Sequence, residues 1–239
     1  MPSGRMLMVE APSLVLAEDA GKLLRRTPQP RFAAAASRAD RRVLRAMSQV
    51  SESARAVARS AAAAFGGKPK VHAHRDEDRS HSVDIVACAD RPSPGLVSSS
   101  TLTLHMVPNK IEGDDIRVEL AGVAEDSAKD FPNLLATAAF YVIKDRWKAG
   151  PGIVFPSLLR EYGLSKTLEH VIWMEPFEST KLGSVDVGGG LTVHGLQAVP
   201  ISESLWLLRD IDGFHCERLC DTSVMRAGSI KVLDDQAGA

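Results

Sequence analysis

Aromatic residues and cysteines are scarce in this chain, and each scarcity narrows the possible classes of protein. Only 5% of the 239 residues are aromatic, although 44% are hydrophobic. We therefore expect a core built mainly from Leu, Val, Ile and Ala. The three cysteines, Cys88, Cys216 and Cys220, are too few, and odd in number, for a disulfide framework. Their number favours a reducing, cytoplasmic location.

Long hydrophobic runs and catalytic motifs are missing as well. No apolar run reaches transmembrane length, and Glu10, Glu18 and Asp19 interrupt any signal-peptide core, so we expect no membrane partner. The Gly-x-Ser-x-Gly motif is absent, and no Ser, His and Asp set indicates a hydrolase. The glycines at 188–190 lack the Lys and Ser/Thr that follow in a phosphate-binding loop. These absences favour a protein that is not an enzyme.

Charge is present in balanced amounts but is unevenly distributed. Residues 1–70 contain 13 Lys/Arg and 5 Asp/Glu, a balance of +8, whereas residues 71–239 contain 16 and 25, a balance of −9. The split predicts a basic arm on an acidic body. The arginines between Arg41 and Arg59 have no interleaved aromatic residues, which argues against a nucleic-acid partner.

Three regions follow from this pattern. Residues 1–36 carry the helix breakers Pro12, Pro28 and Pro30 and no sustained periodicity, which predicts a poorly ordered leader. Residues 37–66 are expected to form a basic amphipathic helix with Ser37 as its N-cap and Gly66-Gly67 after its end. Residues 67–239 are expected to form a single domain.

Strand and helix patterns are mixed irregularly in this domain, which predicts an α+β fold with a mixed, mostly antiparallel sheet and packed helices. A helix is expected over 132–148, with Leu135, Ala139 and Val142 on its buried stripe. The triple glycine favours a hairpin, and Ser202 is a suitable N-cap for a following helix. A last helical segment is expected over 214–220. The expected strands cover 71–74, 82–87, 99–106, 116–123, 171–174, 185–187 and 191–193.

The order of several short segments resembles the Suppressor of fused domain family. The similarity covers roughly residues 57–225. It begins with AAAAFGGKPKV and VDIV, continues through RVEL, a long helix and the loop GPGIVFP, and ends with HVIWMEP and GLQAVPISES. The serine-rich stretch 95–106 and the apolar run 205–208 depart from the pattern of the family. The resemblance implies a binding protein without a cofactor, and a bacterial member of the family of the immunity-protein type in a polymorphic toxin system.

An immunity protein that buries a toxin's active site needs complementary charge and no catalytic group of its own. We therefore predict that the partner is bound by acidic residues that are concentrated in the expected loops and strands. They are Asp114, Asp115, Glu119, Glu125 and Asp126. Glu119 has a second interpretation, because an acid inside an apolar strand must be paired, with Arg117 or a more distant base, if it is buried.

A histidine cluster supports a rival hypothesis. His72 and His74 are two residues apart on an expected strand, so both side chains project from one face, and His81 and Asp84 follow closely. Such residues could hold zinc or iron, which would indicate a metal-dependent enzyme. A solvated strand face explains the same pattern, so the prediction is that no metal is bound.

Overall fold

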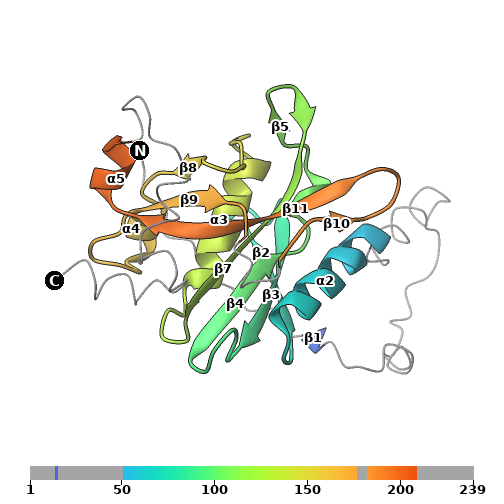
Figure 1. The fold of residues 1–239 in the computed structure, drawn as a ribbon, viewed down its shortest axis with the longest axis horizontal. Coiled ribbons are helices and arrows are strands. Elements are labelled where there is room, and N and C mark those ends of the chain that lie inside the picture. The colour runs from blue at the N-terminus through green and yellow to red at the C-terminus, as the bar shows by residue number, and fades with distance from the viewer. Residues whose placement is uncertain (1–13, 16–50, 177–181, 209–239) are drawn as a thin grey trace.

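The fold was analysed in a computed structural model that describes residues 14–15, 51–176 and 182–208 (Figure 1). The expected leader lies outside these ranges apart from residues 14–15, and the expected helical segment 214–220 lies outside them altogether. None of the described helices is both long and apolar enough to cross a membrane.

One nine-stranded sheet organises the described chain. Its order is β1-β2-β3-β4-β7-β11-β9-β8, and β10 pairs with β11 outside this path. Strands β7 and β11 are parallel, and every other described pairing is antiparallel, so the predicted α+β fold with a mixed, mostly antiparallel sheet is confirmed. The strands are β1 (Leu14–Val15), β2 (Lys70–Arg75), β3 (Ser82–Ala89), β4 (Leu96–Thr101), β7 (Arg117–Glu125), β8 (Val154–Phe155), β9 (His170–Met174), β10 (Val185–Asp186) and β11 (Thr192–Ile201).

Strand β11 joins the two halves of the sheet. Its first half, Val193–Gln197, runs parallel to Arg117–Ala121 of β7, and its second half, Gln197–Ile201, runs antiparallel to β9. The turn at residues 188–190 places β10 antiparallel to the start of β11, as the triple glycine predicts, and all three glycines have positive φ.

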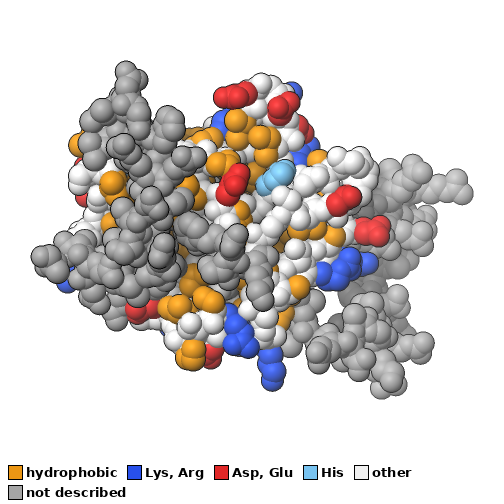
Figure 2. Space-filling view, in the orientation of Figure 1, with side chains coloured by type: hydrophobic (Ala, Val, Ile, Leu, Met, Phe, Trp, Pro, Cys, Tyr) orange, Lys and Arg blue, Asp and Glu red, His pale blue; other side chains and the backbone are white. Residues whose placement is uncertain are grey.

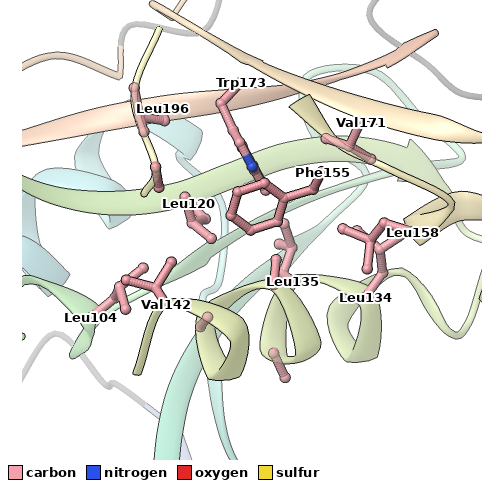
Figure 3. Close-up of a cluster of buried hydrophobic side chains, with 14 of the residues drawn as sticks. Leu104, Leu120, Leu134, Leu135, Val142, Phe155, Leu158, Val171, Trp173 and Leu196 are labelled. Carbon is pink, nitrogen blue, oxygen red and sulfur yellow. The ribbon is translucent and has the colours of Figure 1, made fainter. Parts of the chain in front are cut away.

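Helix α3 (Phe131–Ile143) covers one face of the sheet and forms the main core with it. Leu135, Ala139 and Val142 are buried, as predicted. Figure 3 shows Leu134, Leu135 and Val142 of α3 facing Leu120, Phe155 and Trp173 from the strands. At the first turn of the helix, Phe131 packs against Gly122 of β7, where a Cβ atom would lie 2.5 Å from the ring. Gly122 therefore permits the close approach of helix and sheet.

Helix α3 is shorter than the expected span 132–148. The carbonyl of Tyr141 accepts hydrogen bonds from the N–H groups of both Asp145 and Trp147, and Arg146 between them is left-handed with φ +60°. A left-handed residue reverses the chain at a helix end. The Trp147 ring then stacks on Tyr141 with 4.6 Å between ring centroids. These contacts end the helix before Lys148.

Helix α2 (Glu52–Phe65) covers the opposite face of the sheet. Val57 and Ala61 of α2 pack with Val86 of β3, whereas the neighbouring Ile85 belongs to the core under α3. Ser51 caps the helix by accepting a hydrogen bond from the Ala54 N–H. The expected N-cap, Ser37, lies outside the described residues.

Shorter elements complete the fold. They are the 3-10 helix η1 (Leu104–Met106), β5 (Lys110–Ile111), β6 (Asp114–Asp115), α4 (Leu158–Tyr162) and α5 (Glu203–Leu208). The expected strand over 99–106 is wrong in its second half, because the chain leaves the sheet after Thr101 and turns into η1. Ser202 accepts a hydrogen bond from the Leu205 N–H at the start of α5, as expected of an N-cap.

Candidate partner-binding surface

The five predicted partner-binding acids do not form one patch. Asp114 and Asp115 lie in β6, just before the start of β7, whereas Glu125 and Asp126 lie at its far end. Nine residues of extended strand separate the two pairs, which corresponds to roughly 25–30 Å. A single small epitope cannot include both pairs.

Glu119 is buried, with only 3% of its surface exposed. Its carboxylate accepts hydrogen bonds from the Thr101 hydroxyl, from the Leu104 N–H and from the N–H and Nδ1 of His105, the last at 2.6 Å. It therefore belongs to an internal network and contributes nothing to a surface patch. The second interpretation of Glu119, as a buried and paired acid, is therefore the correct one. Its partner is His105 rather than Arg117. The same carboxylate accepts hydrogen bonds from the N–H groups of Leu104 and His105 in η1. These hydrogen bonds replace those of a sheet and explain why the chain leaves it after Thr101.

Asp114 and Asp115 belong to a small hairpin, residues 109–116, which we call the acidic hairpin. Strands β5 and β6 pair Lys110 with Asp115 and Ile111 with Asp114. The turn residues Glu112 and Gly113 have φ of +52° and +101°. Positive φ at both central residues is typical of the tight turns that match the twist of paired strands.

The acidic hairpin is firmly attached to the body at its base. Buried Asn109 donates its side-chain amide to the Ala149 carbonyl at 2.7 Å and accepts from the Ala149 N–H at 3.1 Å. Ile111 packs on Gly150, where an added Cβ would lie 2.5 Å from its Cδ1 atom. The loop 149–156 therefore anchors the hairpin in one orientation. The sequence shows Asn109 only as a polar loop residue, and its partner is 40 positions away.

Charge on the acidic hairpin is concentrated at its tip. Arg117 pairs with Asp115 at 2.7 Å and donates a second hydrogen bond to the His105 carbonyl. The hydrogen bond from Arg117 holds the pKa of Asp115 below its usual value. Glu112 and Asp114 are exposed and have no ion pair among the described residues. Figure 2 shows acidic side chains gathered around this projecting part of the molecule, above an apolar area.

The other pair of acids is less available. Asp126 is exposed but forms an ion pair with Lys129 at 2.8 Å, and Glu125 is only partly exposed and accepts a hydrogen bond from Ser127. Both therefore sit among compensating groups, and we regard the acidic hairpin as the stronger candidate for a binding surface.

The predicted histidine cluster does not assemble into a ligand set. Register pairs His74 with Val83 and His72 with Ile85, which places both histidines on the α3 face, whereas Asp84 pairs with Ala73 on the other face. His81 instead contacts the buried Asp76 at 3.1 Å. Within the described ranges, Glu169, His170 and Glu203 are the one group of three such residues with converging ligand atoms. The geometry therefore gives the rival metal-dependent enzyme no support.

The hydrogen bonds of the second group argue against a metal site there. Ser157 is left-handed, and its N–H donates to Nδ1 of His170 at 2.8 Å. In the neutral ring the proton must then lie on Nε2, which points at Glu203 at 2.7 Å. A metal ion bound to Nε2 would displace this proton. Because Nδ1 accepts the hydrogen bond from Ser157, the ring would then carry no proton at all. This buried histidine is better explained as a link between the α4 region and α5.

The described residues thus form an α+β scaffold from which an anchored acidic hairpin projects, and the predicted histidine cluster does not form a ligand set on it. The sequence profile of the Suppressor of fused protein (SUFU) family matches residues 79–205, just over half of the chain. The protein therefore belongs to the Suppressor of fused family, as the order of its segments indicates. It is also similar to the protein named Immunity protein YqcF of Bacillus subtilis (strain 168), with 31% identity over 156 residues, 64% of this chain and 81% of that relative. Family and relative together support a protein-interaction role.

Proposed function

We propose that this protein binds and sequesters a partner protein, as an immunity protein does a toxin, and that it acts in the cytoplasm. The observation that carries the proposal is the 31% identity to a protein named as an immunity protein, over 81% of its length. Sequestration requires a complementary surface, and the partner-blocking step itself uses no catalytic group. The balance of −9 beyond residue 70 suits a basic partner, such as a toxin whose site binds phosphate.

The acidic hairpin is the proposed contact surface. Its base is fixed by the Asn109–Ala149 hydrogen bonds, so its tip loses little conformational freedom when it binds. Glu112 and Asp114 project from the tip without a described ion pair and can meet basic groups of the partner. Glu125 and Asp126 lie too far away to share that contact.

Co-expression with the product of a toxin gene next to the gene of this protein tests the function. We expect growth to be restored and the two proteins to purify together as a complex. Normal folding of this protein without protection and without complex formation would contradict the proposal. The same assay on a toxin from an unrelated system provides the control for specificity.

A further inference from the structure

Four polar side chains from three separate elements form a continuous chain of hydrogen bonds beneath α2. The Ser51 and Ser53 hydroxyls are 2.9 Å apart, Ser53 Oγ lies 3.2 Å from Nε2 of His105, and Nδ1 of His105 lies 2.6 Å from Oε1 of Glu119. Ser53 stands in the first turn of α2, His105 in η1 and Glu119 on β7. The arrangement is a serine, a histidine and an acid in series.

The direction of every hydrogen bond in this chain follows from its neighbours. The carboxylate of Glu119 is surrounded by donors, so Nδ1 of His105 carries a proton toward it, and in the neutral ring Nε2 is then an acceptor. The Ser53 hydroxyl must then donate to Nε2. Ser51 accepts from the Ala54 N–H, which leaves its own proton free to point at Ser53. All protons are therefore aligned from Ser51 through Ser53 to His105.

The two residues His105 and Ser53 differ in burial, because the histidine is enclosed and the serine is accessible. His105 and Glu119 are 1% and 3% exposed, so the imidazole is held in one orientation, whereas Ser53 remains partly exposed. A nucleophile hydrogen-bonded to a base, with that base oriented by an acid, is the arrangement that activates a serine in hydrolases of unrelated folds.

We propose that Ser53 is an activated nucleophile that accepts acyl groups from small carboxylic esters, with His105 as its general base and Glu119 as the residue that positions His105. As the Ser53 Oγ–carbon bond forms, the hydroxyl proton passes to Nε2 of His105. The same proton then passes to the leaving alkoxide as the ester C–O bond breaks. Water, deprotonated by His105, releases the acid and restores Ser53.

The start of α2 supplies the remaining requirement, a site for the negative charge on the reacting carbonyl oxygen. The first N–H groups of a helix have no acceptor within the helix. Those of Ala54 and Arg55 bond to Ser51, whereas the N–H groups of Glu52 and Ser53 have no acceptor among the described residues. Backbone N–H groups in such a position stabilise an oxyanion.

A fluorophosphonate probe tests the proposal on the full-length protein, because the reaction joins phosphorus to a nucleophilic serine and expels fluoride. We expect one covalent adduct per chain, mapped to Ser53 by mass spectrometry and absent from Ser53→Ala. Ser60→Ala, two turns further along the same helix, should label like the wild type. His105→Gln should label about 100-fold more slowly.

Labelling of folded protein separates catalysis from a structural role. Glu119→Gln should slow labelling of Ser53 while the protein stays folded, because the orientation of the His105 ring depends on the carboxylate. A folded wild-type protein that does not label, or that labels at another residue, overturns the proposal. This readout needs no variant that may fail to fold. The inference is independent of the proposed function, since Ser53→Ala should still protect against the toxin.

Discussion

At the scale of single residues, burial decides what each polar side chain can do in this protein. Glu119 stands in a strand beside exposed acids, yet four donors hold it inside, where it orients His105. His74 is also buried, but its Nδ1 atom has no hydrogen-bond partner among the described residues. Glu119 can therefore stay charged inside the protein, because its donors replace the lost water. His74 destabilises the fold if it becomes charged, because no described residue replaces the water at Nδ1.

His74 predicts a loss of stability in acid. Burial, together with nearby His72, lowers the pKa of His74 to about 4, compared with about 6.5 when the chain is unfolded. The unfolded chain therefore takes up a proton between these values that the folded protein resists. The stability contributed by neutral His74 is complete above pH 6.5 and falls by roughly 3 kcal/mol as the pH drops to 4.

Chemical unfolding of the wild type and His74→Gln at several pH values measures this term. The free energy of unfolding of the variant should depend less steeply on pH between 6.5 and 4. His194→Gln, an exposed histidine on β11, should leave the slope unchanged. Parallel slopes for the wild type and His74→Gln would show that His74 titrates normally in the folded protein.

At the scale of elements, helix α3 and the acidic hairpin are both fixed by contacts far away in sequence. The helix is anchored by its buried stripe and by the approach of Phe131 to Gly122, and the hairpin by the hydrogen bonds of Asn109 to Ala149. Helix α3 accordingly contributes to the stability of the fold, whereas the hairpin presents an exposed tip on an anchored base.

Leu135 measures the contribution of α3 to stability. Its side chain is fully buried against the sheet, so Leu135→Ala removes apolar contacts and leaves a cavity. We expect the free energy of unfolding to fall by about 2–5 kcal/mol in denaturant titrations. Leu207→Ala is the matched control, because Leu207 is 62% exposed and should change stability by less than about 0.5 kcal/mol. Equal effects of the two substitutions would contradict the packing of α3 on this sheet.

At the scale of the whole molecule, we expect the separation of charge along the chain to affect how the proposed partner approaches. The balance of −9 beyond residue 70 attracts a basic partner over a distance of about one Debye length, which is roughly 10 Å at 0.1 M salt. Electrostatic attraction of this kind accelerates encounter more than it slows dissociation.

Binding kinetics with the proposed toxin partner test this charge effect. Raising the salt concentration from 0.05 to 0.5 M should slow association about 10-fold or more and change dissociation little. Asp114→Lys at the tip of the acidic hairpin should slow association further. Asp126→Lys makes the same change of charge at the far end of β7 and should have a smaller effect. If Asp126→Lys slows association as much as Asp114→Lys, the contact surface is not the acidic hairpin.

The sequence by itself determined the fold class, the buried stripe of α3, the hairpin at the triple glycine and the family. These features depend on local periodicity, turn residues and segment order, all of which are properties of neighbouring positions. Only the tertiary structure decided which polar residues meet. It placed Asp84 and the two strand histidines on opposite faces, turned Glu119 inward and separated the four remaining acids by the length of β7. It also brought Ser53, His105 and Glu119 together from positions with no shared motif, because a sheet joins residues through register and packing that spacing along the chain does not encode.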